Sequence, residues 1–135
     1  MTTTMNVLQS EMTETELGSL PGDWDVLPLG EVYEIQQGKA VSKKHRRGKK
    51  PSPFLRTSNV YWGRLEMSQL DEMDFTDKER DKLRLRKGDL LVCEGGEIGR
   101  TAIWNGELED CYYQNHIFRV RSVTENVVPL FHMYW

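Results

Sequence analysis

The segment Glu94-Gly95-Gly96-Glu97-Ile98-Gly99-Arg100 is the most distinctive part of this 135-residue sequence. Glycine allows the backbone to bend sharply or to approach another surface, and the guanidinium of arginine suits the recognition of phosphate. The glycine spacing does not match a dinucleotide-binding fingerprint, and the residues that follow are β-branched and aromatic instead of helix-forming. We therefore expect a turn between two apolar strands, with Arg100 directed toward a polyanion.

A second group of residues, between Ile35 and Leu65, is strongly basic. This segment contains nine Lys or Arg and no Asp or Glu, although the whole chain has a net charge of −3. Cations at this density can neutralise DNA phosphates, and the polar side chains among them can present donors and acceptors to base edges. A solubilising loop is the alternative interpretation of the charge.

Fourteen residues of these two groups are predicted to contact DNA. For Asn59, a role in turning the backbone is the alternative. The predicted set is Lys39, Lys43, Lys44, Arg46, Arg47, Lys49, Lys50, Arg56, Thr57, Ser58, Asn59, Tyr61, Arg64 and Arg100.

The sequence lacks the residue patterns of nuclease, adenine-methylation and metal-binding sites. No lysine follows an acidic residue by two positions, as in metal-dependent restriction nucleases, and no Asn-Pro-Pro-aromatic segment is present to hold an adenine for methylation. The three histidines lack partners at metal-ligand spacing. We expect no catalytic residue, no metal and no cofactor.

Length and composition indicate one compact domain. No stretch is apolar for long enough to form a secretory signal or to span a bilayer, so a cytoplasmic location is expected, with Cys93 and Cys111 as unpaired thiols. Residues 1–20 are predicted to be a flexible or weakly helical leader, and residues 21–135 the domain, truncated near a helix that begins at Pro129.

Short strands and one short helix must position the basic and glycine-rich segments. Strands are predicted over residues 24–30 and 54–60 and on both sides of the glycine-rich segment. Asn105-Gly106 is a hairpin signal that should pair residues 101–104 with a strand over 111–121. Thr76 and Glu79 have the spacing of a capping box, which predicts a helix ending at about Leu83.

Other segments are less regular. Residues 31–35 fit either one helical turn or a strand, and residues 38–53 should form a solvated loop. In the strand over 111–121, Ile117, Arg119 and Arg121 should lie on the face opposite to Phe118 and Val120. Gln114-Asn115-His116, at the start of this strand, is expected to tie neighbouring loops to the sheet.

Taken together, these segments resemble the target recognition domain of type I restriction-modification specificity subunits. The matching pieces occur in the same order and cover nearly all of the chain after residue 20. They are 22–39, Leu55-Arg56-Thr57-Ser58-Asn59-Val60 with Gly63, Lys87-Gly88-Asp89-Leu90-Leu91-Val92, the segment 94–102, and Gln114-Asn115-His116 with Arg119-Val120-Arg121.

The resemblance implies both a fold and a function. The fold would be α+β, a single globular domain with a strongly curved, mostly antiparallel sheet and short helices. The function would be sequence-specific recognition of double-stranded DNA, one half of a bipartite site, in prokaryotic defence. The subunit would be non-catalytic and would act with a methyltransferase (modification) subunit and, through it, with the restriction subunit.

The resemblance also assigns different roles to different residues. The glycines of segment 94–100 and Arg119 would be framework, whereas base reading would fall to residues 39–52 and 57–64. Two alternatives remain open. One is a truncated interaction module that binds the methyltransferase subunit without binding DNA by itself, and the other is the recognition part of a single-chain restriction-methylation enzyme.

Overall fold

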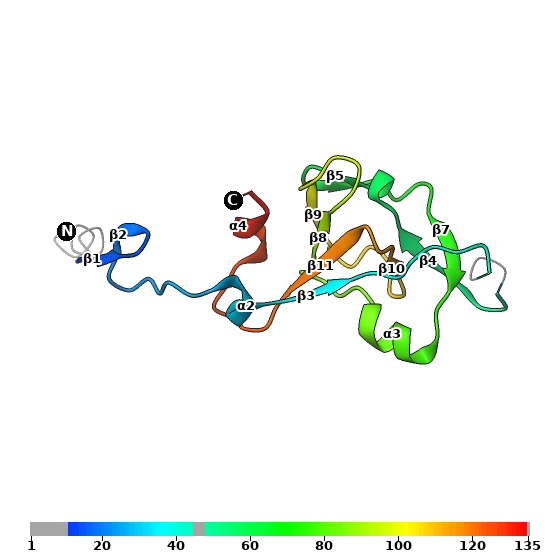
Figure 1. The fold of residues 1–135 in the computed structure, drawn as a ribbon, viewed down its shortest axis with the longest axis horizontal. Helices are drawn as coiled ribbons and strands as arrows, with labels where there is room; N and C mark the ends of the chain where they lie inside the picture. The colour runs from blue at the N-terminus through cyan, green and yellow to red at the C-terminus, as the bar shows by residue number, and fades with distance from the viewer. Residues whose placement is uncertain (1–10, 45–47, 135) are drawn as a thin grey trace, which may run out of the picture.

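The computed structural model describes residues 11–44 and 48–134, which form short strands and helices (Figure 1). The elements in chain order are β1 (Met12–Thr15), β2 (Gly18–Pro21), α2 (Leu29–Val32), β3 (Tyr33–Gln37), β4 (Pro51–Leu55), the 3₁₀ helix η2 (Thr57–Asn59), β5 (Val60–Tyr61), β6 (Arg64–Leu65), β7 (Asp71–Asp74), α3 (Asp77–Leu83), β8 (Leu90–Cys93), β9 (Thr101–Ile103), β10 (Tyr112–Tyr113), β11 (Ile117–Ser122) and α4 (Pro129–Tyr134).

Two sheets form the body of the domain. One has the strand order β3-β11-β8-β9 and the other the order β10-β4-β7, while β1-β2 and β5-β6 are separate hairpins. Among the described strands, every pairing is antiparallel except β10 with β4. The α+β class with mostly antiparallel pairing is confirmed, and the strands divide between two sheets instead of forming one continuous sheet.

A single hydrophobic core joins the two sheets. Phe54 and Leu55 of β4 and Leu91 of β8 are fully buried in it, together with Trp104. Phe75 stacks on Tyr112 with ring centroids 4.3 Å apart, which fastens the segment before α3 to β10. Cys93 and Cys111 are free and buried, as predicted, and burial raises the pKa of Cys111 to about 12.

Strand β11 has the predicted alternation of faces. Ile117 and Arg119 are buried, whereas Phe118 and Val120 are only partly so. The guanidinium of Arg119 donates to the carbonyl of Lys82 (2.6 Å) and to Glu34 Oε1 (2.8 Å). Arg121 donates from Nε to Asp89 Oδ1 (2.7 Å). These charges therefore hold β3, β11 and the segment after α3 together.

The Asn105-Gly106 prediction is wrong. Strand β9 pairs with β8, in the register Leu91 opposite Ala102, and β11 pairs with the other edge of β8. No described residue other than glycine has a positive φ, so Asn105 does not adopt the conformation that a type I′ turn requires. Its backbone N–H instead donates to the Glu107 carboxylate at 3.0 Å, within a longer exposed loop.

Two other expected strands differ from the structure. Residues 24–28 form no strand, and the chain next forms α2 and then β3, so residues 31–35 contain both of the alternatives predicted for them. The strand expected over 54–60 is interrupted by η2, because the side chain of Asn59 binds the backbone of Arg56 and turns the chain. By contrast, α3 and α4 begin where predicted, at the Thr76 cap and at Pro129.

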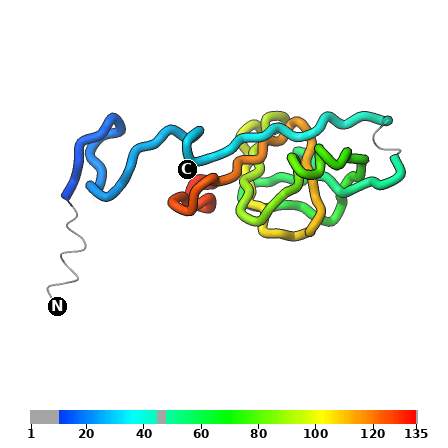
Figure 2. Tube along the Cα trace, turned by 90° about the horizontal axis from the view of Figure 1, so that it is seen from below, coloured from blue at the N-terminus to red at the C-terminus, as the bar shows by residue number. Residues whose placement is uncertain are grey.

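The described part of the leader is a hairpin and not a helix. Strands β1 and β2 pair in the register Thr13 opposite Leu20, and the hairpin stands away from the two sheets (Figure 2). Residues 22–28 connect it to the domain without regular structure. Among the described residues, no helix is long and apolar enough to cross a membrane.

Candidate nucleic-acid interface

The basic segment leaves β3 at Gly38, where the backbone passes very close to another turn. A Cβ atom at Gly38 would lie 2.3 Å from the carbonyl oxygen of Gln114, so only glycine fits there without a shift. The next residue, Lys39, donates its backbone N–H to Tyr113 and accepts from Asn115 N. These bonds tie the start of the basic loop to the turn between β10 and β11.

Lys39 is expected from the sequence to contact DNA, but the structure uses its ammonium inside the protein. Nζ lies 2.8 Å from Glu79 Oε1 and 2.8 Å from the carbonyl oxygen of Asp74, and only 9% of the side chain is exposed. Burial opposes ionisation of Glu79, but hydrogen bonds from Lys39 and Thr76 outweigh it and hold the pKa of Glu79 below its usual value. Lys39 therefore anchors the loop to α3.

The other described lysines of the loop are exposed. Lys43 and Lys44 lie at its tip, and Lys49 and Lys50 lie where it returns to β4. Gly48 lies against the Asp74 carboxylate, and the backbone N–H of Lys50 donates to Asp74 Oδ1 at 3.2 Å. Arg46 and Arg47 lie outside the described residues.

The segment that follows β4 combines one exposed cation with a buried amide. Arg56 is half exposed and donates to Asp71 Oδ2 at 2.7 Å. Asn59 is only 5% exposed, and its side chain accepts from the backbone N–H of Arg56 (2.8 Å) and donates to the carbonyls of Glu66 and Gln69 (2.9 Å each). The alternative interpretation of Asn59 as a turn residue is therefore the one the structure supports, and base contact is not.

Arg100 also faces the protein instead of standing free. Its Nη2 donates to the carbonyl oxygen of Thr57 at 2.9 Å, and its guanidinium lies 5.7 Å from the centre of the Tyr61 ring. Arg64 lies over the same ring, 4.8 Å from its centre. Arg100 thus joins the glycine-rich segment to η2.

The glycines of this segment allow three parts of the chain to meet. Gly95 lies against His116, Gly96 against Arg100 and Thr57, and Gly99 against the ring of Trp62. Gly96 and Gly99 have φ angles of +74° and +91°, which side-chain-bearing residues rarely adopt. The segment is therefore a framework turn beside the candidate interface.

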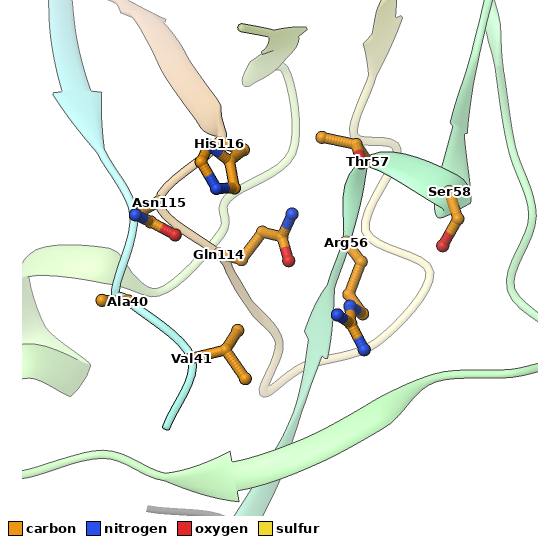
Figure 3. Close-up of a pocket in the computed structure, with 8 residues that line it drawn as sticks. All are labelled: Ala40, Val41, Arg56, Thr57, Ser58, Gln114, Asn115 and His116. Carbon is orange, nitrogen blue, oxygen red and sulfur yellow. The ribbon is translucent and has the colours of Figure 1, made fainter. Parts of the chain in front are cut away.

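A hollow of about 520 Å³ opens between η2 and the turn that connects β10 to β11 (Figure 3). One wall carries Arg56, Thr57 and Ser58, and the opposite side carries polar residues of the turn. The complete lining is Ala40, Val41, Arg56, Thr57, Ser58, Gln114, Asn115 and His116.

The sequence predicts that residues 114–116 tie neighbouring loops to the sheet, and their backbone does serve in that way. Asn115 N donates to the carbonyl of Lys39, and the carbonyl of His116 accepts from Glu94 N. Their side chains, however, lie beside the hollow and form no hydrogen bond with any residue that the structure describes. The sequence signal for a binding role is three consecutive hydrogen-bonding residues. The same signal fits residues that tie loops to the sheet, so it does not identify a binding site.

The fold and this surface together define a small domain in which loops carry exposed cations and unpaired polar side chains over a compact framework. A family profile described as the type I restriction modification DNA specificity domain matches residues 21–135, and the chain belongs to that family. This membership confirms the resemblance inferred from the sequence and supports the prediction of a non-catalytic component.

Individual relatives are consistent with this assignment. The chain is 23% identical over 130 residues to a Methanocaldococcus jannaschii protein assigned as the specificity subunit of the type I restriction enzyme MjaX, covering 93% of this chain and 30% of that protein.

Two solved structures share the fold. The HsdS subunit from Thermoanaerobacter tengcongensis is 18% identical, with a TM-score of 0.65, over 98% of this chain and 32% of that one. A chain from a study of complex assembly and conformational transition of the type I R-M system is 17% identical, with a TM-score of 0.64, over 96% and 31%. The present chain therefore spans about a third of the length of these relatives.

Proposed function

We propose that this chain recognises double-stranded DNA sequence-specifically, as one half of a bipartite site, for a type I restriction-modification complex. The main support for the proposal is that the exposed Lys43 and Lys44 lie two and three residues after Val41, a residue that lines the hollow. Lysines on a loop tip supply the charge that phosphates require, and unpaired polar side chains beside them supply directed hydrogen bonds. Partners would be a methyltransferase subunit and, through it, a restriction subunit.

The DNA-contacting set follows from accessibility. The Lys39 side chain, which is only 9% exposed, and the buried Asn59 are paired within the protein, and the partly buried Arg100 donates to Thr57, so these three are left out. Arg56 donates to Asp71, but 44% of its side chain is exposed, so it is kept. The remaining predicted residues, together with the turn residues, form the proposed interface: Lys43, Lys44, Arg46, Arg47, Lys49, Lys50, Arg56, Thr57, Ser58, Tyr61, Arg64, Gln114, Asn115 and His116.

The basic loop is tested through the salt dependence of DNA binding. Changing Lys43, Lys44, Arg46 and Arg47 together to Ala should weaken binding and lower the log–log salt slope by roughly one unit per lost phosphate contact. Binding of a labelled duplex by the full chain, alone and with the methyltransferase subunit, would be measured by fluorescence anisotropy over a series of salt concentrations.

A matched variant removes the same charge elsewhere. Lys78, Lys82, Arg86 and Lys87 are exposed on α3 and after it, and none forms a side-chain ion pair among the described residues. Their replacement by Ala should leave the slope near that of the unchanged chain. Equal slopes for both quadruple variants would remove the basic loop from the interface.

Sequence specificity is tested by selection from a random duplex library with the full chain and its methyltransferase subunit. Enrichment of one short sequence, corresponding to one half of a bipartite site, is expected. Co-purification with the methyltransferase subunit, with no affinity for any duplex, would instead select the interaction-module alternative, for which the exposed acidic loop 107–110 offers a surface.

A further inference from the structure

We propose that the hollow between η2 and the β10–β11 turn receives a phosphodiester group of one DNA strand, bound by the side-chain amide of Gln114. This inference rests on the proposed function, since it requires that the chain bind DNA. It adds the position of a backbone contact and a residue that makes it. It also predicts that this contact is independent of base sequence.

Gln114 is held in place by its backbone on several sides. Its N–H donates to the carbonyl of Leu55 (2.9 Å), its carbonyl accepts from Ile117 N (3.1 Å), and it forms a parallel bridge with Lys39. These bonds fix the starting direction of the side chain. In Figure 3 the amide extends into the hollow, toward the segment of Arg56 and Thr57.

The amide of Gln114 has no partner where it lies. The residue is only 5% exposed, and no described residue hydrogen-bonds with its side chain. Buried side-chain atoms without a hydrogen-bond partner occur, among the described residues, only at Arg100 Nε and Arg119 Nε, so the amide atoms of Gln114 are not enclosed by the protein. The amide instead faces the hollow, where a ligand can reach it. The Asn59 amide, which is equally buried, is fully paired and shows that this fold can satisfy such a group.

The groups around Gln114 can all donate hydrogen bonds. Thr57 and Ser58 carry hydroxyls and Asn115 a second amide. Arg56 carries a guanidinium that donates from Nη1 to Asp71, and its side chain is 44% exposed, so its other N–H groups can serve a ligand. The non-bridging oxygens of a phosphodiester are acceptors, so they can use every one of these donors. Ala40 and Val41 add an apolar wall, which suits the adjacent deoxyribose.

The shape of the site also favours the DNA backbone over a base. Base edges lie in the grooves and are reached by side chains that project from a protein surface. Phosphates lie on the outside of the duplex, and a concave site with recessed donors suits a group that projects toward the protein. The exposed Lys43 and Lys44, a few residues beyond the hollow wall, would contact neighbouring phosphates.

The test replaces Gln114 by Met, which keeps the length of the side chain and removes the amide. Affinity for the duplex recovered by selection, and for duplexes with each of its base pairs changed, should fall by about tenfold to a similar extent in all cases. The salt slope should not change, because glutamine carries no charge. The melting temperature should change little, because the substitution removes no side-chain hydrogen bond to a described residue.

Two further measurements make the assignment specific. Ethylation of single phosphates should identify one phosphate whose modification weakens binding by the unchanged chain but not by Gln114→Met. Asn126→Leu makes an equivalent amide-to-apolar change in the exposed turn between β11 and α4, and it should leave affinity unaltered.

Three results would overturn the inference while leaving DNA recognition standing. They are unchanged affinity of Gln114→Met, a loss confined to duplexes with one particular base pair, and a clear fall in melting temperature, which would reveal a structural partner for the amide. If the unchanged chain bound no duplex at all, the proposed function would fail and this inference with it.

Discussion

At the scale of single residues, the same side-chain amide takes opposite roles within this domain. The Asn59 amide closes three hydrogen bonds to the backbone, whereas the Gln114 amide closes none with the described residues. The sequence leaves two roles open for each residue, contact with DNA and hydrogen bonding within the protein. It does not specify which backbone carbonyls lie within reach of either amide. Charge therefore predicts where the candidate interface lies, whereas the division of its residues into framework and surface required the structure.

Removing the Asn59 amide should test its framework role. In Asn59→Ala, one backbone N–H and two carbonyls lose their partners, so the free energy of unfolding should fall by about 2–4 kcal/mol. Urea unfolding followed by circular dichroism measures this change. The exposed neighbour provides the control, since Ser58→Ala should alter stability little. Full stability of Asn59→Ala combined with weakened DNA binding would return Asn59 to the interface.

At the scale of elements, local signals predicted the helices well and pairing of strands poorly. Helix α3 is specified within a few residues, by the reciprocal bonds between Thr76 and Glu79. The Asn105-Gly106 signal is also local, but β9 finds its partner in β8, where Leu91 and Ala102 are fully buried. Burial of apolar area over a whole strand outweighs the preference of one turn, and that burial depends on residues distant in the sequence.

The cap of α3 should matter beyond the helix, because Glu79 also binds the Lys39 ammonium at the base of the basic loop. Thr76→Ala removes the side-chain acceptor for the Glu79 amide and should cost about 1 kcal/mol. Thr76→Ser retains a hydroxyl at the cap and should cost much less. Thermal unfolding of both variants is the measurement, and equal melting temperatures for the two would show that the cap contributes nothing.

At the scale of the whole molecule, the acidic net charge conceals a basic surface. Several carboxylates are engaged by cations of the framework: Asp110 by Arg80 and Arg84, and Asp89 by Arg121. A hydrogen bond from Tyr112 and the two arginines hold the pKa of Asp110 below its usual value, so this carboxylate stays ionised and paired. The lysines at the loop tip have no such partners among the described residues and remain available to a polyanion. Net charge alone therefore says little about what this domain binds.

The sequence predicts that the domain begins at residue 21, and this boundary can be tested by deletion. The β1–β2 hairpin pairs with itself and stands away from the sheets in both views (Figures 1 and 2). Deleting residues 1–20 should therefore leave the melting temperature and the duplex affinity unchanged, as measured by calorimetry and anisotropy.

Deleting residues 129–135 provides the contrast to that deletion. Helix α4 contacts β9, and the Tyr33 hydroxyl lies 2.5 Å from His132 Nδ1, so its removal exposes part of the sheet and should lower the melting temperature. If the N-terminal deletion lowered it as much, the hairpin would belong to the cooperative unit and the domain would begin before residue 21.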